Sequence, residues 1–127
     1  RAVYEGVAFS HRTHVGQLFS VRPPARAARF AGGAARSDVW LQIFADVLQM
    51  PVQLTACEEL GAMGAAMAAG VSVGLFSGFE EAVQAMVRVT RTIDPDPRAR
   101  EVYDAKFERY QASIAALGGL WNAGAGG

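Results

Sequence analysis

The sequence has very little cysteine, and this scarcity excludes two kinds of site. Cys57 is the one cysteine among 127 residues. A single cysteine excludes an internal disulfide framework and any metal site built from several cysteines, and it is typical of a reducing compartment. We therefore expect a cytoplasmic protein.

Excess charge of one sign and long apolar runs are also missing. Twelve Lys and Arg residues balance twelve Asp and Glu residues, and no basic stripe interleaved with aromatic residues appears. This balance gives no indication of a nucleic-acid or anionic-membrane surface. No apolar run reaches the roughly 18 residues that a membrane-spanning helix needs. We expect neither nucleic acid nor a membrane as a partner.

The sequence does contain enough apolar residues for one small α/β domain. Hydrophobic residues make up 51% of the chain and charged residues 19%, which suits a globular domain with a modest core. Apolar residues at helical spacing, together with capping and breaking residues, predict a series of helices. These helices are predicted to begin near Arg1, Ser37, Glu59, Ser77 and Arg98.

Short strands are predicted between the helices, over residues 27–31 and 52–54. Two strands make too small a sheet to bury the apolar faces of these helices, so we expect further strands upstream, in a longer chain. The last helix is predicted to end at Leu117, before a pair of glycines. We expect residues 1–121 to belong to one domain and the Gly- and Ala-rich residues 122–127 to form a flexible tail.

The strongest candidate for a ligand site is the glycine pair Gly32-Gly33, which lies between a predicted strand and the helix that Ser37 would cap. Glycine lets the backbone approach a ligand without a Cβ in the way, and the N–H groups at a helix start attract phosphate. The loop has neither the dinucleotide fingerprint nor the lysine of a Walker A loop. Spacing alone therefore leaves a nucleotide-phosphate loop and an ordinary turn as alternatives.

Other reactive side chains do not form a recognisable constellation. His11 and His14 lie three residues apart, but no third ligand has suitable spacing, so we assign no metal. Cys57 stands next to Glu58 and Glu59, an acidic setting in which a thiol is a poor nucleophile. The two glutamates suit the start of a helix. We assign no catalytic residue.

Three segments resemble, in order and spacing, the C-terminal domain of the FGGY carbohydrate kinases. They are residues 1–9 (RAVYEGVAF), 31–46 (AGGAARSDVWLQIFAD) and 58–66 (EELGAMGAA). Pro95, followed by Tyr103 and Tyr110 on the last predicted helix, resembles the end of these kinases, so the resemblance covers nearly the whole chain. Within the family, the segments resemble most the branch of L-xylulose / 3-keto-L-gulonate kinases.

The resemblance implies a fold, a reaction and a set of binding residues. The fold would be part of an actin-like (ribonuclease H-like) ATPase domain, helix-rich with few short strands. The reaction would be phosphoryl transfer from ATP with Mg²⁺ to a sugar that another domain mainly holds. Gly32, Gly33 and Ala34 would approach the α-phosphate and ribose, and Ser37 would stand where the family often contacts adenine. The residues around Glu59 would approach the base.

The resemblance also limits what the chain would do alone. The family's aspartate base and its N-terminal phosphate loop have no counterpart here, so we expect no kinase activity from the isolated chain. Two alternatives stay open: a non-catalytic actin-like nucleotide-binding or assembly module, and a structural fragment that pairs through an exposed sheet edge. A homodimer also stays open, and the sequence does not indicate which sugar is phosphorylated.

Overall fold

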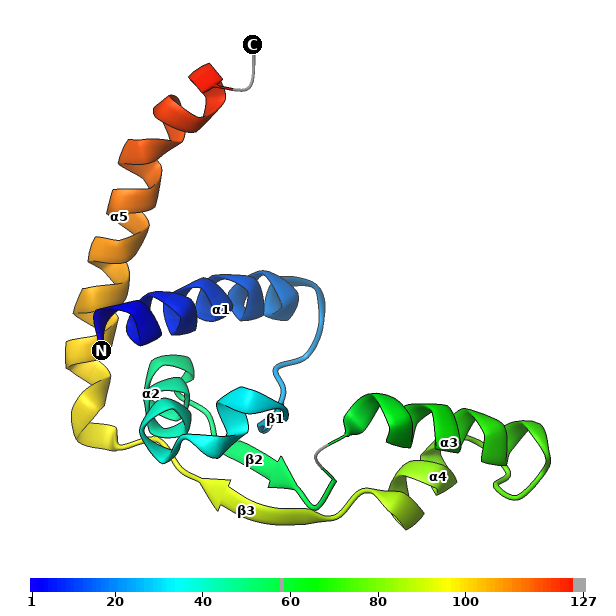
Figure 1. Cartoon of the computed structure of the whole chain (residues 1–127). Helices are drawn as coiled ribbons and strands as arrows, with labels where there is room; N and C mark the ends of the chain where they lie inside the picture. Colours follow the sequence, from blue (N-terminus) through cyan, green and yellow to red (C-terminus); the bar gives the residue numbers. More distant parts are fainter. Residues whose placement is uncertain (58, 125–127) are drawn as a thin grey trace.

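The computed structural model describes residues 1–57 and 59–124, with side chains for all of these except Ala34 and residues 119–124 (Figure 1). Helices alternate with short strands along the chain. In order, the elements are α1 (Ala2–Val21), β1 (Ala28–Phe30), the 3₁₀ helix η1 (Gly33–Arg36), α2 (Asp38–Leu48), β2 (Val52–Thr55), α3 (Leu60–Ser72), α4 (Phe79–Met86), β3 (Val89–Ile93), the 3₁₀ helix η2 (Pro97–Ala99) and α5 (Arg100–Gly124).

The described strands form one sheet in the order β1-β2-β3. β1 pairs parallel to β2, and β3 pairs antiparallel to β2, with Val52 opposite Ile93. The predicted α/β class is confirmed, but the sequence prediction missed β3. Four of the five residues of β3 are exposed and only Ile93 is buried, so this strand lacks the alternating apolar pattern by which strands are recognised.

Helix α2 is the centre of the core and lies between α1 and the sheet (Figure 1). Its start is set by Ser37, whose side-chain oxygen accepts a hydrogen bond from the Trp40 N–H, as predicted for a capping residue. Its Phe44 ring contacts Phe30 of β1, with ring centroids 4.5 Å apart. The buried core comprises Ala8, Phe9, Leu41, Ile43, Phe44, Ala45, Val47, Val52, Ile93 and Tyr103.

A buried carboxylate, Asp46, fixes the end of the sheet to the start of the last helix. It is 7% exposed and accepts hydrogen bonds from the Gln42 amide at 2.9 Å and from the backbone N–H of Asp96 at 2.8 Å. Gln42 also donates to the Asp94 carbonyl at 3.0 Å. Because a buried charged group must be hydrogen-bonded, this network positions the segment between β3 and α5.

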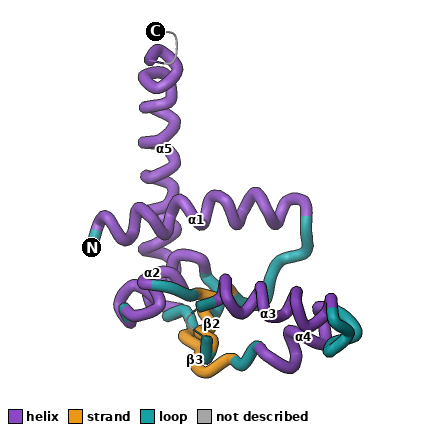
Figure 2. Tube along the Cα trace, turned by 45° about the vertical axis from the view of Figure 1, so that its right-hand side comes forward, coloured by secondary structure: helices purple, strands orange, loops and turns teal. Residues whose placement is uncertain are grey.

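Helices α3 and α4 pack mainly on each other and extend away from the core beside the end of the sheet (Figures 1 and 2). The small residues of α3 predict close packing, but a Cβ added at Gly61 or Gly64 would meet nothing within 4 Å in the described chain. The close approach occurs instead at Gly70, where an added Cβ would lie 2.8 Å from the Phe76 ring. The residue that caps α4 is Gly78 rather than the predicted Ser77.

Helix α5 crosses α1 and continues well beyond it (Figure 2). The prediction that it ends at Leu117 is wrong: Gly118 does not adopt a positive φ, and the helix continues to Gly124. Residues 122–124 of the predicted tail thus belong to α5, and residues 125–127 lie outside the described residues. In the part of the chain that the structure describes, neither α5 nor any other helix combines the length and hydropathy needed to cross a bilayer.

The crossing of α1 and α5 is held by a second buried carboxylate, Glu5, which is 7% exposed. It accepts hydrogen bonds from Lys106 Nζ at 2.9 Å, from Arg1 Nε at 2.9 Å and from the Tyr103 hydroxyl at 3.3 Å. Burial opposes ionisation of Glu5, but the hydrogen bonds from Lys106 and Arg1 outweigh it and hold the pKa below its ordinary value.

Replacing Glu5→Gln is expected to lower the free energy of unfolding at neutral pH by about 1 to 2 kcal/mol, because charge-assisted hydrogen bonds are lost. Since the folded pKa of Glu5 is below its unfolded value, the stabilisation is present above the unfolded pKa and lost as pH falls through the folded one. Urea unfolding of both proteins near neutral pH and at about pH 3 measures how much of this stabilisation is lost at low pH. Glu108→Gln, at an exposed position of α5, is the control. Equal stability of the Glu5 and Glu108 variants at neutral pH would contradict the prediction.

Candidate functional site

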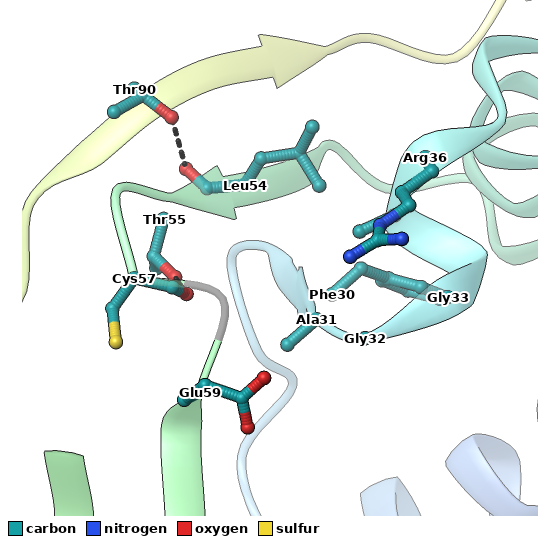
Figure 3. A pocket seen from close by; sticks show the side chains of 11 residues that line it. Phe30, Ala31, Gly32, Gly33, Arg36, Leu54, Thr55, Cys57, Glu59 and Thr90 are labelled. Atoms are coloured by element: carbon teal, nitrogen blue, oxygen red, sulfur yellow. Dashed lines mark hydrogen bonds between the residues drawn. The ribbon is translucent and has the colours of Figure 1, made fainter. Parts of the chain in front are cut away.

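The candidate site is a pocket at the carboxyl ends of β1 and β2. Because these strands are parallel, the segments that follow them meet at one edge of the sheet. They line an open pocket of about 370 Å³, which we call the glycine-loop pocket (Figure 3). Its described lining residues are Phe30, Ala31, Gly32, Gly33, Ala35, Arg36, Leu54, Thr55, Cys57, Glu59 and Thr90.

The two glycines have different structural roles. Gly32 has φ +76°, a conformation that residues with a Cβ rarely adopt, and its carbonyl accepts a hydrogen bond from the Ala35 N–H at 3.0 Å. Gly33 begins η1 without a positive φ, and a Cβ added there would meet nothing within 4 Å. The positive φ therefore favours glycine at Gly32, whereas the structure has room for a Cβ at Gly33.

The pocket contains two threonine hydroxyls and two charged side chains. Thr55 Oγ1 donates to the Cys57 carbonyl at 3.2 Å, and Thr90 Oγ1 donates to the Leu54 carbonyl at 3.3 Å. The charged side chains among the described lining residues are Arg36, at the end of η1, and Glu59, at the start of α3 (Figure 3). The pocket thus offers one cationic and one anionic group beside an exposed glycine backbone.

The predicted binding residues are only partly brought together. Gly32 and Gly33 line the pocket, and Ala34 lies between them and Arg36 in η1, with its side chain outside the described residues. Ser37 is not among the described lining residues, and its side-chain oxygen serves as the cap of α2. Its predicted contact with adenine stays a prediction.

Several lining residues were missed by the sequence interpretation. Arg36 had a signal, since it stands three residues after Gly33 in the same loop, whereas Thr90 had none because it belongs to the missed strand β3. Cys57, which the sequence analysis treated only as a poor nucleophile, is partly buried and lines the pocket. Glu58, the glutamate that directly follows Cys57, lies outside the described residues.

The histidines considered as metal ligands lie away from this pocket, on α1. His11 Nδ1 is 2.9 Å from the Val7 carbonyl oxygen, and its ring meets Phe44 edge-on at 5.3 Å. His14 lines a separate hollow between α1 and α5. Within residues 1–57 and 59–124, no three His, Cys, Asp or Glu side chains gather as a metal site would require.

Comparison with known proteins identifies the family that shares this arrangement. Residues 1–73 match the FGGY family of carbohydrate kinases, C-terminal domain. The chain therefore belongs to the FGGY carbohydrate kinase family, and the resemblance seen in the sequence is confirmed. The fold is likewise that of the solved FGGY sugar kinases, part of an actin-like ATPase domain.

Individual relatives are sugar kinases of much greater length. The chain is 43% identical to L-xylulose/3-keto-L-gulonate kinase of Escherichia coli strain K12, over 94% of this chain and 24% of that protein. It is 42% identical to autoinducer-2 kinase of the same strain, over 65% of this chain and 16% of that one. The crystal structure of xylulose kinase from Rhodospirillum rubrum matches with a TM-score of 0.81 and 38% identity, covering 96% of this chain and 25% of that chain. The chain thus spans a quarter or less of these relatives.

The different roles of the glycines lead to different expectations for the free energy of unfolding. Gly32→Ala should lower the free energy of unfolding by about 1 to 2 kcal/mol, since the positive φ strains a residue with a Cβ. Gly33→Ala should change it by less than about 0.5 kcal/mol, because the added Cβ points into open space. Urea unfolding of both variants measures the difference, and equal destabilisation would show that this distinction is wrong.

Proposed function

We propose that this chain supplies the adenine-nucleotide-binding part of an ATP-dependent carbohydrate kinase that phosphorylates a ketose, in the manner of its xylulose kinase relatives. The observation that carries the proposal is the glycine-loop pocket, formed at the carboxyl ends of parallel strands in a chain of the FGGY family. Ligands of open α/β sheets bind at this edge. The named sugars differ among the relatives, so the particular ketose is left open.

In the proposed reaction a sugar hydroxyl oxygen attacks the γ-phosphorus of ATP. The hydroxyl proton passes to a base, the bond between the γ-phosphorus and the bridging oxygen breaks, and ADP leaves. Phosphoryl transfer depends on positioning and on neutralising charge. The chain spans about a quarter of its xylulose kinase relatives, so we assign the base and most sugar contacts to the remainder of the complete enzyme.

The contribution of this chain is to position the nucleotide. We propose that the exposed backbone of Gly32, Gly33 and Ala34 approaches the α-phosphate and ribose. Ser37 would contact adenine through its hydroxyl proton, which the capping hydrogen bond of α2 does not use, since Ser37 Oγ is the acceptor there. The described residues offer no cluster of metal ligands, so we assign Mg²⁺ to the nucleotide phosphates and to other parts of the enzyme.

Binding of ATP is expected to protect the Cys57 thiol from alkylation. Cys57 is the one cysteine of the chain and lines the glycine-loop pocket, so its rate of modification reports occupancy of that pocket. At an ATP concentration ten times the dissociation constant, modification should slow about tenfold, because only the unoccupied fraction reacts. Mass spectrometry of chain treated with iodoacetamide measures the rate, and calorimetry measures the dissociation constant.

Two controls accompany this measurement. Urea-unfolded chain should show no effect of ATP, and a chain ending at residue 121 should show the full effect, because we assign the binding unit to residues 1–121. Absence of binding heat together with an unchanged modification rate in saturating ATP would refute the assignment of a nucleotide site to this chain.

A further inference from the structure

Helix α5 is anchored to the rest of the described chain along its first half. Lys106 donates to Glu5 of α1 at 2.9 Å, and Arg12 of α1 donates to Asp104 at 2.6 Å. Residues 111–117, which follow this anchored half, are all exposed, and the helix continues beyond them away from α1 (Figures 1 and 2). The second half of α5 thus leaves the surface on which the first half packs.

The charged residues of α5 are confined to the anchored half. They all lie between Arg100 and Arg109, whereas residues 111–124, which we call the distal arm, contain no Asp, Glu, Lys or Arg. A helix that meets water on most of its surface normally carries charged side chains there. The arm instead exposes Ile114 at 41% and Leu117 at 43%. Its composition is that of a helix covered by another surface.

The helical conformation of the distal arm also needs outside support. Gly118 and Gly119 stand in its middle, and each glycine inside a helix costs about 1 kcal/mol relative to alanine. The anchored half supplies the nucleus of the helix, but two successive glycines favour unwinding beyond them. Since most helical stability in proteins comes from tertiary packing, contact with another surface would supply what the local propensity of the arm lacks.

A hollow at the base of the distal arm extends this surface onto α1. It has a volume of about 390 Å³ and is lined by residues of both helices, among them Thr13, His14, Tyr110 and Ile114. None of its described lining residues is an Asp, Glu, Lys or Arg. The arm and this α1–α5 hollow therefore form one continuous surface that suits an apolar, uncharged partner face.

The length of the relatives indicates what covers this surface. The xylulose kinase structure from Rhodospirillum rubrum matches 96% of this chain; the unmatched 4% is about five of 127 residues, so most of the 25-residue α5 is included. Three quarters of that kinase lie outside the match, because this chain covers 25% of it. A partner face within the same polypeptide docks at a high effective concentration, whereas a second copy must lose translational freedom.

We propose that the distal arm and the α1–α5 hollow dock onto the part of the complete kinase that this chain does not span. The inference rests on the proposed function in one respect, that the chain is part of a longer kinase. It does not depend on nucleotide binding, since the surface lies on α1 and α5 and shares no described residue with the glycine-loop pocket.

Hydrogen exchange measured by mass spectrometry compares the complete kinase with the isolated chain. Amides of the distal arm should exchange at least about 100-fold more slowly in the complete kinase, because docking opposes local opening of the helix. Peptides from residues 101–109, in the anchored half of the same helix, are the internal control and should be protected in both proteins.

A pair of matched variants of the complete kinase tests the same surface by thermal unfolding. Ile114→Asn should lower Tm by about 3 to 8 °C and remove most of the added protection of the arm, because a side-chain amide would be buried in an apolar contact. Val102→Asn also replaces an exposed β-branched residue of α5, in the anchored half, and should lower Tm by less than about 2 °C.

Three results would overturn the inference. Equal exchange of the distal arm in both proteins would show that the rest of the kinase does not cover it. Protection in the isolated chain that rises with its concentration would assign the surface to a second copy. A reading frame that encodes no further kinase segment would remove the proposed partner. A protected arm in a kinase whose glycine-loop pocket binds no ATP would instead refute the proposed function and leave this inference in place.

Discussion

Parallel pairing of β1 with β2 is the constraint on which the rest of the structure depends. Parallel neighbours cannot be joined by a tight turn, so the chain must cross over the sheet, and α2 provides that crossover. The crossover buries Leu41, Phe44 and Val47 against α1 and the sheet. It also brings the segments after both strands to one edge, where the glycine-loop pocket forms. Core and site thus follow from the same pairing.

Helix α5 and the segment before it are joined to the rest of the core by two buried carboxylates as well as by apolar contact. Asp46, on α2, holds the segment that leads from β3 to α5 through the backbone N–H of Asp96. Glu5, on α1, accepts hydrogen bonds from Lys106 and Tyr103 of α5. A buried carboxylate left without partners would be costly, so these bonds define how α5 crosses the core. Neither lies at the pocket, and their role is structural.

The sequence predicted the parts of the fold in which local and tertiary signals agree. Ser37 and the apolar face of α2 predicted the crossover helix, and the glycine pair predicted the loop that lines the candidate site. β3 escaped prediction because its pairing with β2, rather than its own mostly exposed residues, makes it a strand. The continuation of α5 through Gly118 likewise contradicts local propensity. Thr90 enters the pocket only through that missed strand.

Under the proposed function, the exposure of the pocket requires that nucleotide placement and phosphoryl transfer be divided between different parts of the enzyme. Gly33, Arg36 and Glu59 are all exposed, so this part alone does not exclude water from a bound nucleotide. An ATP γ-phosphate in such a setting would meet water as readily as a sugar hydroxyl, and electrostatic contacts would be screened. Productive transfer therefore requires a second wall that brings the base and the sugar and closes over the phosphates. Under the proposed function, a chain that spans a quarter of its xylulose kinase relatives would supply one wall of that site.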